Sequence, residues 1–443
     1  MSNALTERIA QEHAAAEESL PGGVVTRPRR RHAIAALVAN GLPTVRDENW
    51  RYANLRPLER ARFTPASQQP NLRPAALRPA LGGYLRYVYL DGAFVSELSA
   101  SGAPPPGVAV HALRDAPAGV SRLERPEGTE PRSDAFALLN EAFAMDGANI
   151  VLTRAAGEPA DAPVCIEVIF IALAKAEDGA SYPRLEVQAG PGTRLRLIER
   201  HLSAESAASP ASLVVGAVEM RIARDAAVDH YRIQQLGARA AWLDSLYATV
   251  DRSASYRLHA FALGAQSARS TLCIRLQGEG AELAQHAVAA GERQQVLDSY
   301  TVVEHAAAHT RTEQSFRGIA GGRSRVAFNG KVIVRPGAHG ADSSQSLRGL
   351  LAGSEAEIDV RPQLEIYTDE VRCSHGATAG KLDENMLFYL LSRGLEPATA
   401  RRLLKWAFLE DVVSKVAVPE LRRQIEESLA DRMEHADVLK ESL

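Results

Sequence analysis

Cysteine is scarce in this chain. Its 443 residues include three cysteines, Cys165, Cys273 and Cys373, which lie far apart in the sequence. This odd, sparse set argues against a disulfide framework and favours a reducing, cytoplasmic setting. The N-terminus carries acidic residues and lacks the apolar segment of a secretory signal, which agrees with that setting.

Long apolar runs and a charge of one sign are also absent. No run of 18 or more apolar residues occurs, so no membrane span is predicted. The 51 Lys and Arg nearly balance the 54 Asp and Glu, which leaves a net charge of −3. This balance gives no general basic surface for nucleic acid, and no nucleic-acid-binding motif is present. The composition is that of a globular protein long enough for more than one domain.

Sequence motifs of common enzymes are missing as well. The chain has no GxxxxGK[ST] phosphate loop, no GxGxxG between a strand and a helix, no HExxH and no CxxC. It should therefore not hydrolyse ATP itself. His305 and His309 lie four residues apart in a β-type segment, and no third ligand is evident. We interpret them as partly buried or interfacial histidines, with a metal site as the alternative.

The N-terminal part of the sequence is predicted to be mainly helical. Residues 1–40 are rich in alanine and charged side chains, with a break at Gly22 and Gly23. The segment 84–95 is predicted to form a hairpin around Asp91-Gly92. Residues 133–150 are predicted to form a helix capped by Ser133 or Asp134, and Trp50 and Tyr52 are expected in the core. A basic cluster is interpreted as a solvated turn, with a docking patch for an acidic partner as the alternative: Arg27, Arg29, Arg30 and Arg31.

The pattern changes between residues 150 and 370. Eleven short β-type runs follow one another there without an intervening helical pattern. This excludes a series of βαβ units and allows either a sandwich of sheets or a β-helix. No strict repeat is visible, so a regular solenoid with a fixed short period is not indicated.

The C-terminal part returns to helical patterns. Asp383 is predicted to cap a helix over 384–393 that ends at Gly394, and Pro397 and Pro419 each suit the first turn of a further helix. The second of these helices carries one predicted apolar stripe: Leu403, Leu404, Ala407, Phe408 and Val412.

The most distinctive local sequence surrounds Cys373 and His375. Two residues apart on a strand, their side chains point to one face. Thiolate and imidazole are soft or borderline ligands that suit iron, zinc or sulfur chemistry. A pair of this kind is weak evidence by itself, because most such pairs are structural.

A longer stretch around this pair resembles a known family. Residues 364–384 and 387–394 resemble the C-terminal signature of the SufB/SufD family. Matching segments elsewhere extend the resemblance over nearly the whole chain: 48–52, 89–92, 136–143, 328–334 and Gln345. Within the family the SufD branch is favoured. A cluster commonly needs about four cysteine-type ligands, and SufB proteins are richer in cysteine than this chain.

The resemblance implies a mainly β fold: a right-handed parallel β-helix core flanked by N-terminal and C-terminal α-helical regions. The expected boundaries are 1–150 for the N-terminal helical region with its small hairpin, 151–372 for the β-helix and 373–443 for the C-terminal helices. It also implies a scaffold or adaptor subunit of the iron–sulfur cluster assembly machinery, not an enzyme. A carbohydrate-active enzyme on a β-helix is the alternative, and it would need converging carboxylates in a groove.

The expected partners are a SufB-like paralogue, bound through the β-helix, and a SufC-like ATPase, bound through the C-terminal helices. The resemblance places His375 at the SufB interface as a metal ligand, with Cys373 beside it. No cofactor is expected to be bound permanently, only transient iron or a nascent cluster at that interface. Cys165 and Cys273 are expected to be buried structural thiols. The isolated chain is expected to form a homodimer through strands near 300–375, because exposed strand edges tend to pair.

Overall fold

The computed structural model describes most of the chain. The described residues are 3–65, 77–100, 102–115, 134–154, 162–173, 179–204 and 212–432. Its centre is a β-solenoid of about seven turns with helices at both ends of the sequence. This confirms the predicted β-helix core between helical regions. No helix among these residues is long and apolar enough to cross a membrane.

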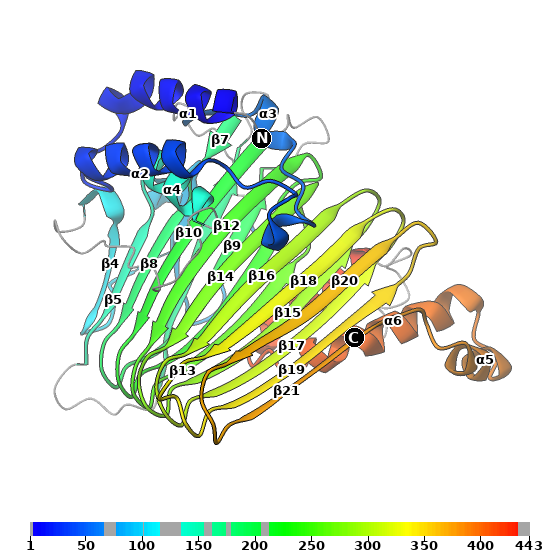
Figure 1. Ribbon diagram of the computed structural model, residues 1–443. Helices are drawn as coiled ribbons and strands as arrows, with labels where there is room; N and C mark the ends of the chain where they lie inside the picture. The colour runs from blue at the N-terminus through cyan, green and yellow to red at the C-terminus, as the bar shows by residue number, and fades with distance from the viewer. Residues whose placement is uncertain are drawn as a thin grey trace.

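Each turn of the solenoid contributes one strand to each of two sheets (Figure 1). The first sheet contains β1 Arg62–Pro65, β4 Val108–Ala112, β5 Ala148–Leu152, β7 Gly179–Ser181, β8 Arg184–Ala189, β10 Ser212–Ile222, β12 Ala240–Val250, β14 Ser267–Leu276, β16 Val296–His305, β18 Arg325–Val334 and β20 Glu357–Ile366. The second sheet contains β2 Leu85–Leu90, β3 Ala93–Phe94, β6 Val164–Ala172, β9 Arg194–Ser203, β11 Ala227–Gln235, β13 Ser255–Ala262, β15 Glu282–Gly291, β17 Arg311–Ala320, β19 Asp342–Leu351 and β21 Arg372–Gly380.

Alternation along the strands fills the space between the two sheets, which we call the lumen. Strand pairing from β8 to β20 and from β6 to β21 is parallel and in register, so equivalent side chains stack in columns along the solenoid. One inward column begins with Leu195, Val228, Tyr256 and Leu283, which are all buried in the same apolar cluster. Full burial of such side chains stabilises the fold by about 1.5–3 kcal/mol each.

The turn length explains why no repeat was visible in the sequence. Gln314 bonds Gln285, 29 residues earlier, whereas Gln345 bonds Gln314, 31 residues earlier. Insertions at the corners change the spacing from turn to turn, and many apolar residues fit an inward position. The unequal spacings agree with the prediction that no regular solenoid with a fixed short period is present.

The N-terminal region packs along the first sheet (Figure 1). The hairpin is confirmed: β2 and β3 are antiparallel and joined at Asp91-Gly92, both with positive φ. The helix predicted over 133–150 is shorter, because residues 148–152 continue as β5. Ser133 lies outside the described residues, and the Asp134 carboxylate accepts a bond from Tyr247 Oη instead of capping the helix. The helices of this region are α1 Asn3–Ala16, α2 Arg27–Asn40, α3 Pro57–Arg60 and α4 Ala135–Phe143.

The basic cluster is part of helix α2, so its interpretation as a solvated turn was wrong. Arg30 is completely buried. Its guanidinium donates to four carbonyl oxygens, among them those of Ala142 and Ala144 at 2.8 and 2.7 Å. Burial, followed by the nearby Arg184, lowers the pKa of Arg30 to about 10. Arg30 therefore joins α2 to the end of α4 and is not available to a partner.

The two N-terminal aromatics differ in burial. Trp50 is buried, as predicted, with its indole 4.3 Å from the Arg269 guanidinium of β14, whereas Tyr52 is half-buried. The residues before position 65 thus rest directly on the middle turns of the solenoid.

Up to residue 432 the C-terminal region contains three helices, as predicted: α5 Glu384–Ser392, α6 Pro397–Val413 and α7 Pro419–Arg432. Asp383 caps α5 by accepting bonds from the Asn385 and Met386 amides, and Gly394 follows with a φ of 87°. Proline opens α6 and α7 as expected. The predicted stripe of α6 is wrong in part, because Leu403 and Ala407 are exposed. The residues that pack against the second sheet are Leu409, Val412, Val413 and Val416.

Candidate functional site

The solenoid ends at two strands that each have one neighbour. Among the strands that the structure describes, β20 pairs only with β18, and β21 only with β19. Both strands are largely accessible, and β21 is exposed at nearly every position. This open end, formed by β20 and β21, carries the residues predicted as a metal site.

Cys373 and His375 occupy inward positions on β21. They are in register with Ser343 and Gln345 of β19, whose side chains are buried in the lumen. The two residues therefore face the same side, at the point where the lumen opens to solvent. Cys373 is half-buried against the lumen core, whereas His375 is exposed.

The environment of Cys373 disfavours its thiolate. Burial raises the pKa of the Cys373 thiol, and the Asp342 carboxylate raises it further. Because the thiolate is the form that binds metals, this thiol is a poor ligand in the free chain at neutral pH. The exposed imidazole of His375 is the better donor of the two.

The pair alone is too small for a complete metal site. Among the residues that the structure describes, no group of three or more His, Cys, Asp or Glu side chains is placed to hold a metal ion. Iron–sulfur clusters generally require about four ligands. Any iron held by Cys373 and His375 therefore needs further ligands from outside the described part of this chain.

Three glutamines line the lumen next to this pair, and sequence reasoning missed their connection. Gln345 Nε2 donates to Gln314 Oε1, and Gln314 Nε2 donates to Gln285 Oε1, both at 2.7 Å. His375 is the next residue of the same column on β21. A search for identical polar residues at the length of one solenoid turn would have found this row.

His305 and His309 do not form a metal site. His305 is buried, and its ring nitrogens contact the hydroxyls of Thr310 and Thr312 at 2.8 and 3.0 Å. His309 lies in the following turn with a φ of 57° and packs edge-on against His339. The two histidines lie on different elements. His305 is fully buried and His309 is exposed, so neither has the predicted partly buried position, and an interfacial role stays a prediction.

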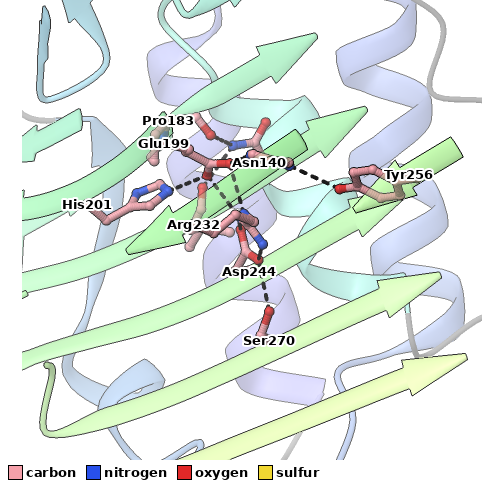
Figure 2. A network of polar contacts seen from close by, with 10 residues as sticks. Asn140, Pro183, Glu199, His201, Arg232, Asp244, Tyr256 and Ser270 are labelled. Atoms are coloured by element: carbon pink, nitrogen blue, oxygen red, sulfur yellow. Dashed lines mark hydrogen bonds and ion pairs between the residues drawn. The ribbon is translucent and has the colours of Figure 1, made fainter. Parts of the chain in front are cut away.

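A second polar centre lies deep in the lumen (Figure 2). Arg232 of β11 donates to Glu199 of β9, with Nε 2.8 Å from Oε2, and to Asp244 of β12, with Nη1 2.9 Å from Oδ2. Glu199 also accepts bonds from His201 Nε2 at 2.5 Å and His230 Nε2 at 2.9 Å. This network of charged groups was not predicted, because its members come from different turns.

The network does not provide the acid–base pair of a glycosidase. Glu199 and Asp244 converge, but both are buried and paired with Arg232. Burial raises the pKa of Glu199, but Arg232 and the two histidine bonds outweigh it, so this pKa lies well below the usual range. Glu199 is thus a buried carboxylate held in its ionised form by Arg232 and without access to a sugar. The neighbouring cavity, lined by His201, Gln234 and several alanines, has a volume of about 50 Å³, which suits a few water molecules.

The other two cysteines differ from each other. Cys273 is buried, and burial raises the pKa of its thiol to about 12, in agreement with an inert structural role. Cys165 is only half-buried, so its prediction as a buried thiol was wrong; its Sγ lies 3.6 Å from the Pro163 carbonyl oxygen. Burial raises the pKa of Cys165 as well.

An apolar surface is exposed on the C-terminal helices. Helix α5 lies beyond the ends of the strands, away from the solenoid body (Figure 1). It exposes Met386 by 57%, Phe388 by 71% and Tyr389 by 56%, and Leu403 of α6 is also exposed. We call these four residues the α5 patch. Exposed aromatic and methionine side chains are enriched in protein interfaces.

The fold and the open end define a class: a β-solenoid with Cys373 and His375 at its accessible last turn and exposed apolar residues on its C-terminal helices. Residues 171–408 match the family described as SUF system FeS cluster assembly, SufBD core domain. Since this match spans more than half of the chain, the protein belongs to the SufB/SufD family and is SufD-like.

Full-length relatives agree with this assignment. The chain is 28% identical to the iron–sulfur cluster assembly protein SufD of Escherichia coli over 93% of this chain and 94% of that protein. It is 26% identical to a SufBD family iron–sulfur cluster assembly protein of Synechocystis over 98% of both chains. A SufBD family protein of Mycobacterium leprae is 30% identical over 46% of this chain and 54% of its own length.

Proposed function

We propose that this protein is a scaffold subunit of iron–sulfur cluster assembly that pairs with a SufB-like paralogue through its open end. The supporting observation is the position of His375, exposed on the last strand and beside too few ligands to complete a site. A partner strand set against β20 and β21 would satisfy their free backbone edges and supply the missing ligands.

The proposed cargo is iron or a nascent cluster that binds transiently between the two subunits. A neutral imidazole is a suitable iron ligand. Cys373 is the secondary candidate, because its raised pKa must fall before its sulfur binds metal. A partner's cations or the metal itself would lower it.

The α5 patch is the proposed docking surface for a SufC-like ATPase. ATP hydrolysis belongs to that partner in this proposal, because the chain has no phosphate-loop motif. In the absence of the paralogue, the same open end is expected to pair two copies of this chain. That homodimer stays a prediction.

The His375→Ala substitution in the complex with both partners tests this function. If His375 is an iron ligand, the variant should assemble with normal yield and ATPase activity. It should, however, lose its iron and its ability to support cluster assembly in cells. The measurement is iron per purified complex beside complex yield. His111→Ala is the matched control, because His111 is also an exposed histidine on a strand, at the far end of the solenoid on β4.

The same experiment separates the alternatives. Normal iron content and normal complementation in His375→Ala would end the ligand role. A loss of complex yield with iron per complex unchanged would assign His375 to hydrogen bonding across the interface instead.

A further inference from the structure

The hydrogen bonds between the glutamines in the lumen all run in one direction along the solenoid. Gln285 Nε2 donates to Thr301 Oγ1 at 3.1 Å, Gln314 Nε2 donates to Gln285 Oε1, and Gln345 Nε2 donates to Gln314 Oε1. Gln314 and Gln345 therefore each give an N–H to the preceding turn, and Gln285 and Gln314 each present their oxygen to the following one. Gln285 gives its own N–H to Thr301 on the facing strand β16. Hydrogen bonds aligned in one direction polarise one another, which makes the last oxygen of the row a stronger acceptor.

The orientation of the last amide is fixed by a backbone group. Gln345 Nε2 also lies 3.2 Å from the Gly330 carbonyl oxygen on β18. An exchange of nitrogen and oxygen would set two acceptors against each other there, so only the N–H₂ group fits on that side. Gly330 makes this contact possible, because a Cβ at its position would lie 2.9 Å from Gln345 Nε2.

The side-chain oxygen of Gln345, Oε1, consequently points away from the acceptor groups that bind Nε2. The side chain is 4% exposed, and Oε1 is buried without a hydrogen-bond partner among the described residues. A buried carbonyl without a partner is unfavourable, so a donor is expected next to it. The next position of the column is His375, on the strand hydrogen-bonded to β19. Adjacent strands lie about 4.8 Å apart, the spacing at which the other members of the row bond one another.

We propose that Gln345 is a positioning residue for His375: its Oε1 accepts a hydrogen bond from one imidazole N–H. This bond selects one neutral tautomer and leaves the lone pair of the other ring nitrogen directed to the open end. Ligand histidines are commonly oriented in this way by a carbonyl or carboxylate behind them. The proposal rests on the proposed role of His375 as an iron ligand, but the proposed bond itself does not require metal.

The test is the tautomeric state of His375 in the metal-free, full-length chain. The 12 histidines are labelled with ¹⁵N, and the His375 signals are assigned by their loss in His375→Ala. Spectra are recorded at pH about 8.5, well above the ordinary pKa of histidine. In the unsubstituted chain the two ring nitrogens should give widely separated shifts, one typical of N–H and one typical of a lone pair. In Gln345→Met the shifts should move toward each other, as in an imidazole that exchanges between tautomers.

Gln314→Met is the matched control. It replaces an equally buried member of the row with the same residue, but it leaves the Gln345 oxygen next to His375. It should preserve the separated shifts. Averaged shifts in the unsubstituted chain, or unchanged shifts in Gln345→Met, would overturn the proposal. If Gln345→Met fails to fold, the spectrum of the unsubstituted chain still tests the proposal, because averaged His375 shifts in that spectrum would contradict it.

Iron content distinguishes this inference from the proposed function. If the shifts respond to Gln345→Met but His375→Ala retains its iron, the positioning bond exists and the ligand role fails. If His375→Ala loses iron while the shifts do not depend on Gln345, the ligand role stands and the positioning role fails.

Discussion

Arg232 and Asp244 join the two sheets across the lumen by a two-point ion pair, with Nη1 2.9 Å from Oδ2 and Nη2 3.0 Å from Oδ1. The same guanidinium binds Glu199 on the neighbouring strand. One buried cation thus pairs with two buried carboxylates, and this geometry makes the middle of the solenoid sensitive to its loss.

Arg232→Met should destabilise the protein by about 3–5 kcal/mol, because two buried carboxylates would lose their cation. The measurement is urea unfolding followed by circular dichroism. Arg325→Met is the control: Arg325 pairs with Glu357 on the exterior, where both side chains are 40% or more exposed. That change should cost about 1 kcal/mol or less. Equal effects of the two substitutions would contradict a structural role for the Arg232 network.

A second prediction concerns pH. The rings of His259 and His286 lie 5.1 Å apart on the second sheet, tilted by 47° relative to each other. Burial lowers the pKa of His259 to about 3 and of His286 to about 4. His286 of β15 is next to Lys415, which lowers its pKa further, while Glu313 of β17 and Asp411 of α6 oppose this. Both rings are therefore neutral in the folded protein at pH 5.

In the unfolded chain these histidines titrate near pH 6.5. Between about pH 6.5 and 4 the unfolded state thus binds more protons, and stability should fall as the pH is lowered. Glu219 acts in the opposite direction, because burial raises its folded pKa to about 7. The urea midpoint at pH 7.5 and 5 should therefore be compared between the unsubstituted protein and His286→Gln. A smaller decrease in the variant is expected, and an identical decrease would exclude His286 as a cause.

The third prediction concerns the α5 patch. Phe388→Ser should weaken binding of the ATPase by about thirtyfold, since loss of a central interface aromatic typically costs about 2 kcal/mol or more. Stability should change by less than about 0.5 kcal/mol, because the ring is 71% exposed. The measurements are affinity by calorimetry and the unfolding midpoint. Val45→Ser, another exposed apolar residue outside the patch, should leave binding unchanged. Undiminished binding by Phe388→Ser would place the ATPase elsewhere.

Local signals allowed much of the architecture to be predicted. Asp91-Gly92 forms its turn from two residues, and Asp383 and Pro397 define helix starts within one turn. Such features depend on neighbours in the sequence, so a single sequence contains the information for them. The positions of Cys373 and His375 on one strand were predictable for the same reason, whereas their metal role stays a prediction.

Long-range relations were not predictable from these patterns. Arg30 was placed in a solvated turn, because only the fold shows the carbonyl groups of α4 that surround it. Glu199 and Arg232 are 33 residues apart, and only the register of β9 and β11 sets them side by side. The corners of the solenoid vary in length, so the spacing that would reveal such pairs differs from turn to turn.

The contacts of Glu48 and Trp50 with the solenoid have a consequence for the order of folding. Each solenoid turn packs mainly on its predecessor, so the core can wind progressively as the chain leaves the ribosome. Glu48, however, pairs with Arg361 across 313 residues of sequence. Trp50 similarly rests on Arg269. Glu48 and Trp50 are therefore synthesised long before the residues that they contact, and until then these contacts stay unmade. Contacts of such high sequence separation are also those that slow folding most.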